Sequence, residues 1–165
     1  LIICFGAHIW LGAQLKLENL AARPVAYRKS STVKATLASR TMIWTGLLVF
    51  SFVVYHLLHF TATTIVPDFE HLTDSQGRHD TYSMVILGFQ NMGVVISYIV
   101  AVGLVCYHLS HGIASMFQSL GWNNRESEKP LRILSVAVST IVFLGYITIP
   151  VAVQLGYLKP MTGGN

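Results

Sequence analysis

The chain has 165 residues, of which 53% are hydrophobic and only 11% are charged. Soluble domains average about 25% charged residues, so this composition excludes an ordinary soluble protein and indicates a membrane protein. The net charge is +4, but no basic patch with interleaved aromatic residues suggests binding to nucleic acid. Residue 1 already lies inside an apolar run, so we expect an N-terminal span to be cut short or missing.

Four apolar segments predict membrane helices, because a helix needs about 20 apolar residues to cross a bilayer. They are residues 1–15, which form a partial span, about 42–66, about 92–117 and about 133–158. Polar or helix-breaking sequence bounds each segment. We therefore predict an all-α fold, a single polytopic transmembrane helical bundle that occupies residues 1–165.

Lysine and arginine in the loops predict the orientation, because cytoplasmic loops carry an excess of these residues. The stretches 16–40 and 122–132 hold nine of the 11, whereas the loop 67–82 holds one basic residue against four acidic ones. We expect the first two stretches to face the cytoplasm, and the loop 67–82 and the C-terminus to face outward. The basic charges are either a solvated surface or a docking site for a soluble partner.

Histidine lies deep inside three of the four apolar segments: His8, His56 with His59, and His108 with His111. An ionisable group is costly in hydrocarbon, so its presence there suggests function. Imidazole is a common metal ligand and a usual axial ligand of haem iron. A membrane haem protein is therefore the first hypothesis.

The depths of the histidines in the bilayer favour one pairing over the others. At 1.5 Å per residue, His8 lies about 12 Å from Lys16, His56 about 24 Å from the cytoplasmic edge, and His108 about 25 Å from the outer edge. His8 and His108 therefore share the inner half of the bilayer and can hold one porphyrin between them. His56 lies in the outer half and has no mate at its depth, and the missing N-terminal span is the natural place for one.

A glycine follows each of the two paired histidines at the same spacing, since His8 precedes Gly12 and His108 precedes Gly112 by four residues. Residues at this spacing share a helix face. Glycine there removes a side chain where a flat macrocycle must lie against the backbone. Because glycine is frequent in membrane helices, one such glycine is weak evidence for a haem site. Its occurrence after both predicted ligands is stronger evidence.

Other roles for the histidines remain open. Any single intramembrane histidine may instead form a hydrogen bond with serine or threonine of a neighbouring helix. His59 and His111 each lie one turn from a predicted ligand, and we expect them to contact that ligand or a haem propionate. His71 and His79 lie in the outer loop and are expected to be solvated.

Five segments carry a family resemblance, of which the last segment and ARPVAY are the most specific. They are GAHIWLGAQL around His8, NLAARPVAY at 19–27, ASRTMIWTG at 38–46, VVYHLLHF at 53–60 and CYHLSHGIASMFQSLGWN at 106–123. With them the chain resembles the cytochrome b558 membrane-anchor subunit of bacterial succinate dehydrogenases and fumarate reductases. The resemblance is to the five-helix, di-haem, single-polypeptide type, and it begins at that family's second helix.

The resemblance implies two haem b groups, each held between histidines of two helices. His8 and His108 would ligate the haem nearer the cytoplasm, in agreement with their depths. His56 would ligate the outer haem together with a histidine of a first helix that this chain does not show. His111 stands next to the matching glycine and could compete with His108, but the position of His108 fits the family pattern.

The resemblance also implies a function in the respiratory chain and the tricarboxylic acid cycle. The subunit would pass electrons between an iron–sulfur subunit and a membrane quinone, while succinate chemistry takes place on a flavoprotein subunit. It would lie in the bacterial cytoplasmic (inner) membrane, with the iron–sulfur subunit on the basic cytoplasmic face. Haem propionates prefer cationic or hydroxyl partners, and the candidates for the inner haem are Arg23, Tyr27, Arg28, Ser39 and Arg40.

Three alternative functions compete with this interpretation. The chain could be the di-haem cytochrome b of a formate dehydrogenase, hydrogenase or nitrate reductase, which would have another soluble partner. It could be a histidine-lined metal transporter, although the four apolar segments contain no Asp or Glu of the kind that many transporters use. It could also be a structural anchor without haem, whose histidines form only bonds between helices.

Overall fold

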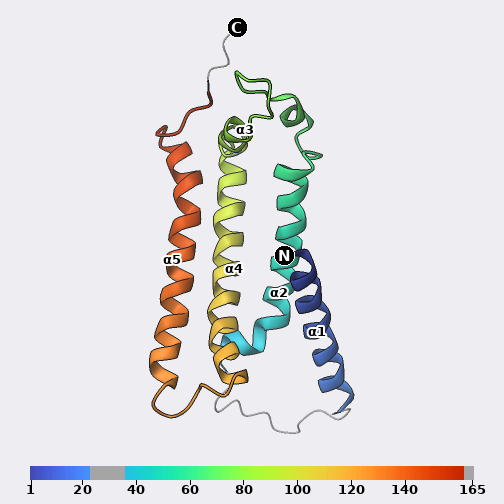
Figure 1. The fold of residues 1–165 in the computed structure, drawn as a ribbon, viewed down its shortest axis with the longest axis vertical. Coiled ribbons are helices and arrows are strands. Elements are labelled where there is room, and N and C mark those ends of the chain that lie inside the picture. Colours follow the sequence, from blue (N-terminus) through green and yellow to red (C-terminus); the bar gives the residue numbers. More distant parts are fainter. Residues whose placement is uncertain (23–35, 162–165) are drawn as a thin grey trace. The chain divides into compact units, whose positions relative to one another are not determined.

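The computed structural model describes residues 1–22 and 36–161 and is almost entirely helical (Figure 1). In these ranges the strand pairing is limited to one isolated bridge between Thr73 and His79. The chain forms two compact units, Leu1–Ile43 and Trp44–Asn165. The helices are α1 (Ile2–Ala21), α2 (Leu37–His56), α3 (Thr81–Gly88), α4 (Met92–Ser119) and α5 (Glu128–Gln154).

Among the described residues, three helices are long and apolar enough to cross a membrane. They cover Leu37–Thr61, Met92–Ser119 and Glu128–Gln154, and most of their large apolar side chains are exposed. In water this exposed apolar surface would be unfavourable, whereas in a bilayer it contacts lipid. The prediction of an all-α transmembrane bundle is therefore confirmed. The partial span 1–15 falls within α1, whose second half carries Lys16 and Glu18.

The second span ends five residues earlier than the sequence predicts. Leu57–Thr61 form a π-helical turn at the end of α2, and Thr63 then takes a left-handed backbone conformation with φ of 48°. A β-branched residue in this conformation cannot continue a helix. Pro67, which begins a short 3₁₀ helix at Pro67–His71, lacks the backbone N–H that a helix interior needs.

The unit Trp44–Asn165 is built around the antiparallel pair α4 and α5, with α3 covering one end of α4 (Figure 1). The buried core lies at this end and contains Ile86, Phe89, Val95, Tyr98 and Val153. The side-chain amide of Gln154 donates hydrogen bonds to the carbonyl oxygens of Phe89, at 2.7 Å, and Gln90, at 3.1 Å. These bonds fix the end of α5 against the turn between α3 and α4.

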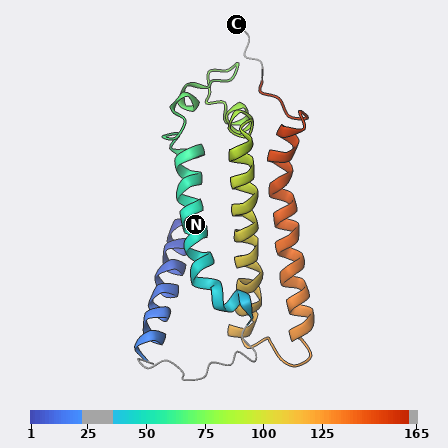
Figure 2. The same cartoon turned by 180° about the vertical axis from the view of Figure 1, so that it is seen from behind.

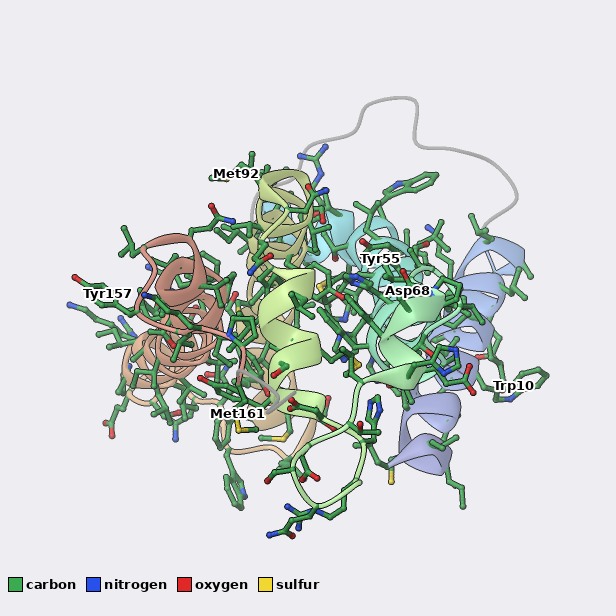
Figure 3. All side chains as sticks on the ribbon, turned by 90° about the horizontal axis from the view of Figure 1, so that it is seen from above. Trp10, Tyr55, Asp68, Met92, Tyr157 and Met161 are labelled. Carbon is green, nitrogen blue, oxygen red and sulfur yellow. The ribbon has the colours of Figure 1, made fainter. Side chains whose placement is uncertain are left out.

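The acidic loop and the C-terminal tail lie at the α3 end, and the loop between α4 and α5 lies at the opposite end (Figure 2). Figure 3 looks down on the α3 end, where the loop that carries Asp68 lies over the end of α2 and Tyr157 points outward. Residues 67–82 and 155–161 thus share a side of this unit, opposite the loop between α4 and α5, as expected for the described part of the chain.

Carboxylates order the acidic loop. Asp74 forms an ion pair with Arg78 at 2.8 Å, and the Arg78 backbone and side chain hold the pKa of this carboxyl below its usual value. Asp80 caps α3 by accepting a hydrogen bond from the Ser83 amide at 2.9 Å, and the bonds from Ser83 lower its pKa. Because Asp74 neutralises the loop's one basic residue, this end of the unit keeps its acidic character.

Gly88, the last residue of α3, permits a close contact with the π-helical turn. A Cβ atom at Gly88 would lie 2.6 Å from Cε1 of Phe60, and the Phe60 ring is held among His59, Phe69 and Phe89. We expect Gly88→Ala to destabilise the protein by about 1–3 kcal/mol, as overpacked cores do. Thermal unfolding in detergent measures the change.

The matched control for this prediction is Gly145→Ala on α5. A Cβ atom at Gly145 would meet nothing within 4 Å, and alanine inside a helix is favoured over glycine by about 0.5–1 kcal/mol. Equal melting temperatures for the two variants would show that Phe60 can move out of the way.

Candidate haem-ligand sites

The first candidate site is formed where α2 and α4 lie side by side. The two helices run in opposite directions, so Thr45 in the first half of α2 faces His108 in the second half of α4. Nδ1 of His108 lies 3.0 Å from Oγ1 of Thr45, whose side chain is only 6% exposed. The imidazole of His108 is thus held by a hydroxyl of the neighbouring helix.

Gly46 brings the backbone of α2 against the same imidazole ring. A Cβ atom at Gly46 would lie 3.3 Å from Cε1 of His108, which is closer than most real Cβ contacts. Glycine therefore allows the ring to lie directly against the helix. Thr45 and Gly46 together form a seat for the His108 ring, with the hydroxyl at Nδ1 and bare backbone beside Cε1.

This geometry favours His108 over His111 as a metal ligand. When Nδ1 of an imidazole is engaged by a hydrogen bond, Nε2 is the nitrogen that coordinates a metal. In His111 the engaged nitrogen is Nε2, which lies 3.1 Å from the hydroxyl of Ser115 on the same helix. His111 is therefore bound within α4, and its predicted contact with the ligand or a haem propionate stays a prediction.

The second candidate site lies nearer the α3 end of the same helix pair. The hydroxyl of Tyr98 on α4 lies 3.1 Å from Nδ1 of His59 and 3.4 Å from Nδ1 of His56. Here α4 supplies the hydroxyl and α2 supplies the histidine, which is the reverse of the Thr45–His108 contact. Each site thus joins an imidazole of one helix to a hydroxyl of the other.

His56 and His59 differ sharply in exposure. His59 is 2% exposed and lies among aromatic rings, with ring centroids 4.1 Å from Phe60 and 6.0 Å from Phe69. The side chain of His56 is exposed. The π-helical turn begins directly after His56 and carries His59, and the loop residue Phe69 covers the ring. His56 alone of this pair can therefore reach a group outside its own unit.

The two sites lie at different heights. Thr45 and His56 are 11 residues apart on α2, and Tyr98 and His108 are ten residues apart on α4, which corresponds to about 15–16 Å along a helix. His56 and His108 thus occupy separate levels of one helix pair. This separation is consistent with one metal centre at each level.

The remaining predicted residues fall in several places. Arg23, Tyr27 and Arg28 lie outside the described residues. Ser39 and Arg40 are exposed near the start of α2, and the Ser39 hydroxyl donates to the carbonyl of Thr36 at 3.0 Å. These assignments stay predictions.

The glycines and the other histidines were also predicted from the sequence. A Cβ atom at Gly12 or Gly112 would meet nothing within 4 Å, so no packing in the described part of the chain requires glycine there. His8 lies on α1, in the unit Leu1–Ile43, and its pairing with His108 stays a prediction. His71 and His79 are exposed, as expected of a solvated loop.

Three residues of these sites, Thr45, Gly46 and Tyr98, were not predicted from the sequence. A Thr-Gly pair inside an apolar helix is a signal for Thr45 and Gly46, because a hydroxyl and a close approach then occur side by side. Tyr98 carries no such signal, since tyrosine is common in membrane helices. Which hydroxyl lies next to which histidine depends on how α2 and α4 are aligned along each other, and the sequence does not give this alignment.

A histidine-lined metal transporter receives no support from the arrangement. Within residues 1–22 and 36–161, no group of three or more His, Cys, Asp and Glu side chains is placed to hold a metal ion. His56, His59, His108 and His111 each lie within 3.4 Å of a serine, threonine or tyrosine hydroxyl. This pattern suits ligands that each take one axial position of a porphyrin-bound metal.

Comparison with known proteins identifies the family. The model of the succinate dehydrogenase/fumarate reductase transmembrane subunit family matches residues 19–147. No curated protein and no solved structure matches the chain. The matched range covers the whole of α2, α3 and α4 and most of α5, so it contains both candidate sites. The chain belongs to the succinate dehydrogenase/fumarate reductase transmembrane subunit family.

Proposed function

We propose that this chain is a haem b-containing membrane anchor of a succinate:quinone oxidoreductase, and that it carries electrons between an iron–sulfur subunit and a membrane quinone. His8 and His108 are the axial ligands of an inner haem. His56 is one axial ligand of an outer haem. The family membership supports the assignment to this enzyme complex. The contacts of Thr45 and Gly46 with the His108 ring are the observation that supports a haem.

The side chains fit a haem at each level. His108 and His56 have hydroxyl groups at Nδ1, at 3.0 Å and 3.4 Å, and this leaves Nε2 as the coordinating nitrogen. A Cβ atom at Gly112, one turn after His108, would meet no atom of the described chain. A macrocycle could lie against the helix there.

Bound haem supplies a one-electron carrier, and histidine at both axial positions favours electron transfer over binding of oxygen. The protein's own contribution is to hold the imidazoles at two heights and to surround them with apolar helices. The hydrogen bonds to the imidazoles and the apolar surroundings both change the reduction potential of the haem, because each alters the relative stability of ferric and ferrous iron.

The soluble partners bind the two basic stretches, 16–40 and 122–132. The loop between α4 and α5 lies at the end opposite α3 and the acidic loop (Figure 2), and it contains Arg125, while Lys129 and Arg132 lie in the first turns of α5. The positive-inside rule makes this the cytoplasmic face of a bacterial inner membrane. The iron–sulfur subunit docks there and the flavoprotein binds to it.

Purification of the complex through a tag on this chain tests the proposal. We expect an iron–sulfur subunit and a flavoprotein that oxidises succinate to co-purify, and the reduced-minus-oxidised spectrum to show the α-band of haem b. A haem-free complex with the same partners would mean a structural anchor. Co-purification with a formate dehydrogenase, hydrogenase or nitrate reductase subunit would identify a different oxidoreductase.

A further inference from the structure

The Thr45–His108 contact has the geometry of a ligand support. Oγ1 of Thr45 lies 3.0 Å from Nδ1 of His108, inside the range of a good hydrogen bond. Thr45 is buried at 6% exposure and His108 is half-buried, so the contact lies mostly inside the protein. Gly46, the next residue, leaves room for the ring, since a Cβ atom there would lie 3.3 Å from Cε1 of His108.

We propose that Thr45 is a positioning residue for His108, and that its hydroxyl sets the ring orientation and lowers the reduction potential of the haem that His108 ligates. Gly46 completes the seat by letting the ring lie against α2. This inference rests on the proposed role of His108 as an axial ligand. It assigns a function to two α2 residues that carry no metal themselves.

The direction of the effect follows from the protonation of the ring. A neutral imidazole that coordinates iron through Nε2 carries its proton on Nδ1. Nδ1–H then donates to Oγ1 of Thr45, and this bond makes Nε2 a stronger electron donor. A stronger donor stabilises ferric iron more than ferrous iron, so the hydrogen bond lowers the reduction potential.

The effect of Thr45 is specific to one of the two levels. At the other level the hydroxyl belongs to Tyr98, which lies 3.4 Å from Nδ1 of His56 and 3.1 Å from Nδ1 of His59. About 16 Å of helix separates Thr45 from His56. A change at Thr45 therefore alters the potential of the haem bound by His108 and leaves the other haem unchanged.

The experiment is a redox titration of the purified whole complex that carries Thr45→Val, followed at the haem α-band. Valine keeps the shape of threonine and removes the hydroxyl. We expect two haems per complex, a higher midpoint potential for one haem and an unchanged potential for the other. The ferric low-spin electron paramagnetic resonance signal of the same haem should also shift, because its ring is free to rotate.

Two matched variants control for general disturbance. Thr45→Ser keeps a hydroxyl at the same position, and we expect it to restore the wild-type potential. Thr140→Val makes the same substitution on α5, where the hydroxyl is exposed and donates to the carbonyl of Val136 at 2.8 Å. We expect both potentials to stay unchanged in Thr140→Val.

Several results would overturn the inference. Two unchanged midpoint potentials in Thr45→Val would show that the hydroxyl only joins the helices, and equal shifts in Thr45→Val and Thr45→Ser would exclude the hydrogen bond as the cause. If Thr45→Val does not assemble, Gly46→Ala decides: its Cβ must displace the His108 ring, and unchanged spectra and potentials would refute the seat. Retention of both haems in His108→Ala would instead refute the proposed ligand itself.

Discussion

Replacing His108 by alanine should reduce the haem content from two per complex to one, and replacing His8 by alanine should remove the same haem. In the proposed arrangement each imidazole is half of a bis-histidine pair. A b-type haem has no covalent link to the protein, so we expect loss of one ligand to release it. Succinate oxidation with an artificial electron acceptor should persist, because that chemistry takes place on the flavoprotein, whereas quinone reduction should be lost.

The measurement is haem content by the pyridine haemochrome assay, together with a redox titration of the haem that remains. The midpoint potential of that remaining haem should be the same in His8→Ala and His108→Ala. Different potentials would mean that the two variants lose different haems, and the pairing of α1 with α4 would then be wrong.

His111→Gln is the comparison variant for His108→Ala. His111 lies one turn further along α4 and forms its contact through Nε2, at 3.1 Å from Ser115. The amide of glutamine reaches the same place and keeps this contact, but it is a poor ligand for haem iron. We expect both haems to remain in His111→Gln, and loss of a haem there would transfer the ligand role from His108 to His111.

The spans could be predicted from the sequence because apolar length alone determines them, but their ends could not. The segment 42–66 contains no charged residue, so hydropathy gave no reason to stop at Thr61. The end depends on the left-handed backbone at Thr63 and on the contact of Phe60 with Gly88. The contact of Phe60 with Gly88 joins the π-helical turn to α3, and a single segment does not encode such a tertiary contact.

In the candidate sites, too, the sequence alone predicts the histidines but not the residues that contact them. His56 and His108 stand out in the sequence because imidazole is rare in hydrocarbon. Their partners Thr45 and Tyr98 come from the facing helix and depend on the register of α2 against α4. The sequence predicts His56 rather than His59 as the haem ligand from its depth in the membrane. The burial of His59, by contrast, is due to Phe69 and the π-helical turn, which the sequence does not reveal.

Replacing His56 by alanine should remove the outer haem and leave the inner haem in place. The His56 side chain is exposed and contacts the Tyr98 hydroxyl at 3.4 Å, so it can reach a haem that lies beside α2. The His56 ring also lies about 6 Å from the rings of Phe60 and Tyr98, so the substitution should cost some stability as well as the haem. The remaining haem should show the potential that is missing in His108→Ala.

His59→Asn distinguishes the ligand from its buried neighbour. The asparagine amide can take the place of Nδ1, which lies 3.1 Å from Tyr98, but an amide is a poor ligand for haem iron. His59 is 2% exposed and packs against Phe60 and Phe69, so the smaller asparagine leaves a gap there and some stability should be lost. We nevertheless expect two haems per complex in His59→Asn.

The contrast between these two variants decides which imidazole of α2 binds iron. Loss of the outer haem in His56→Ala with retention in His59→Asn supports His56. The opposite pattern would require the aromatic cluster of Phe60 and Phe69 to open, since His59 has no exposed path to a macrocycle. His71→Ala, in the exposed loop, should keep both haems and the wild-type potentials, because its side chain lies outside the apolar helices.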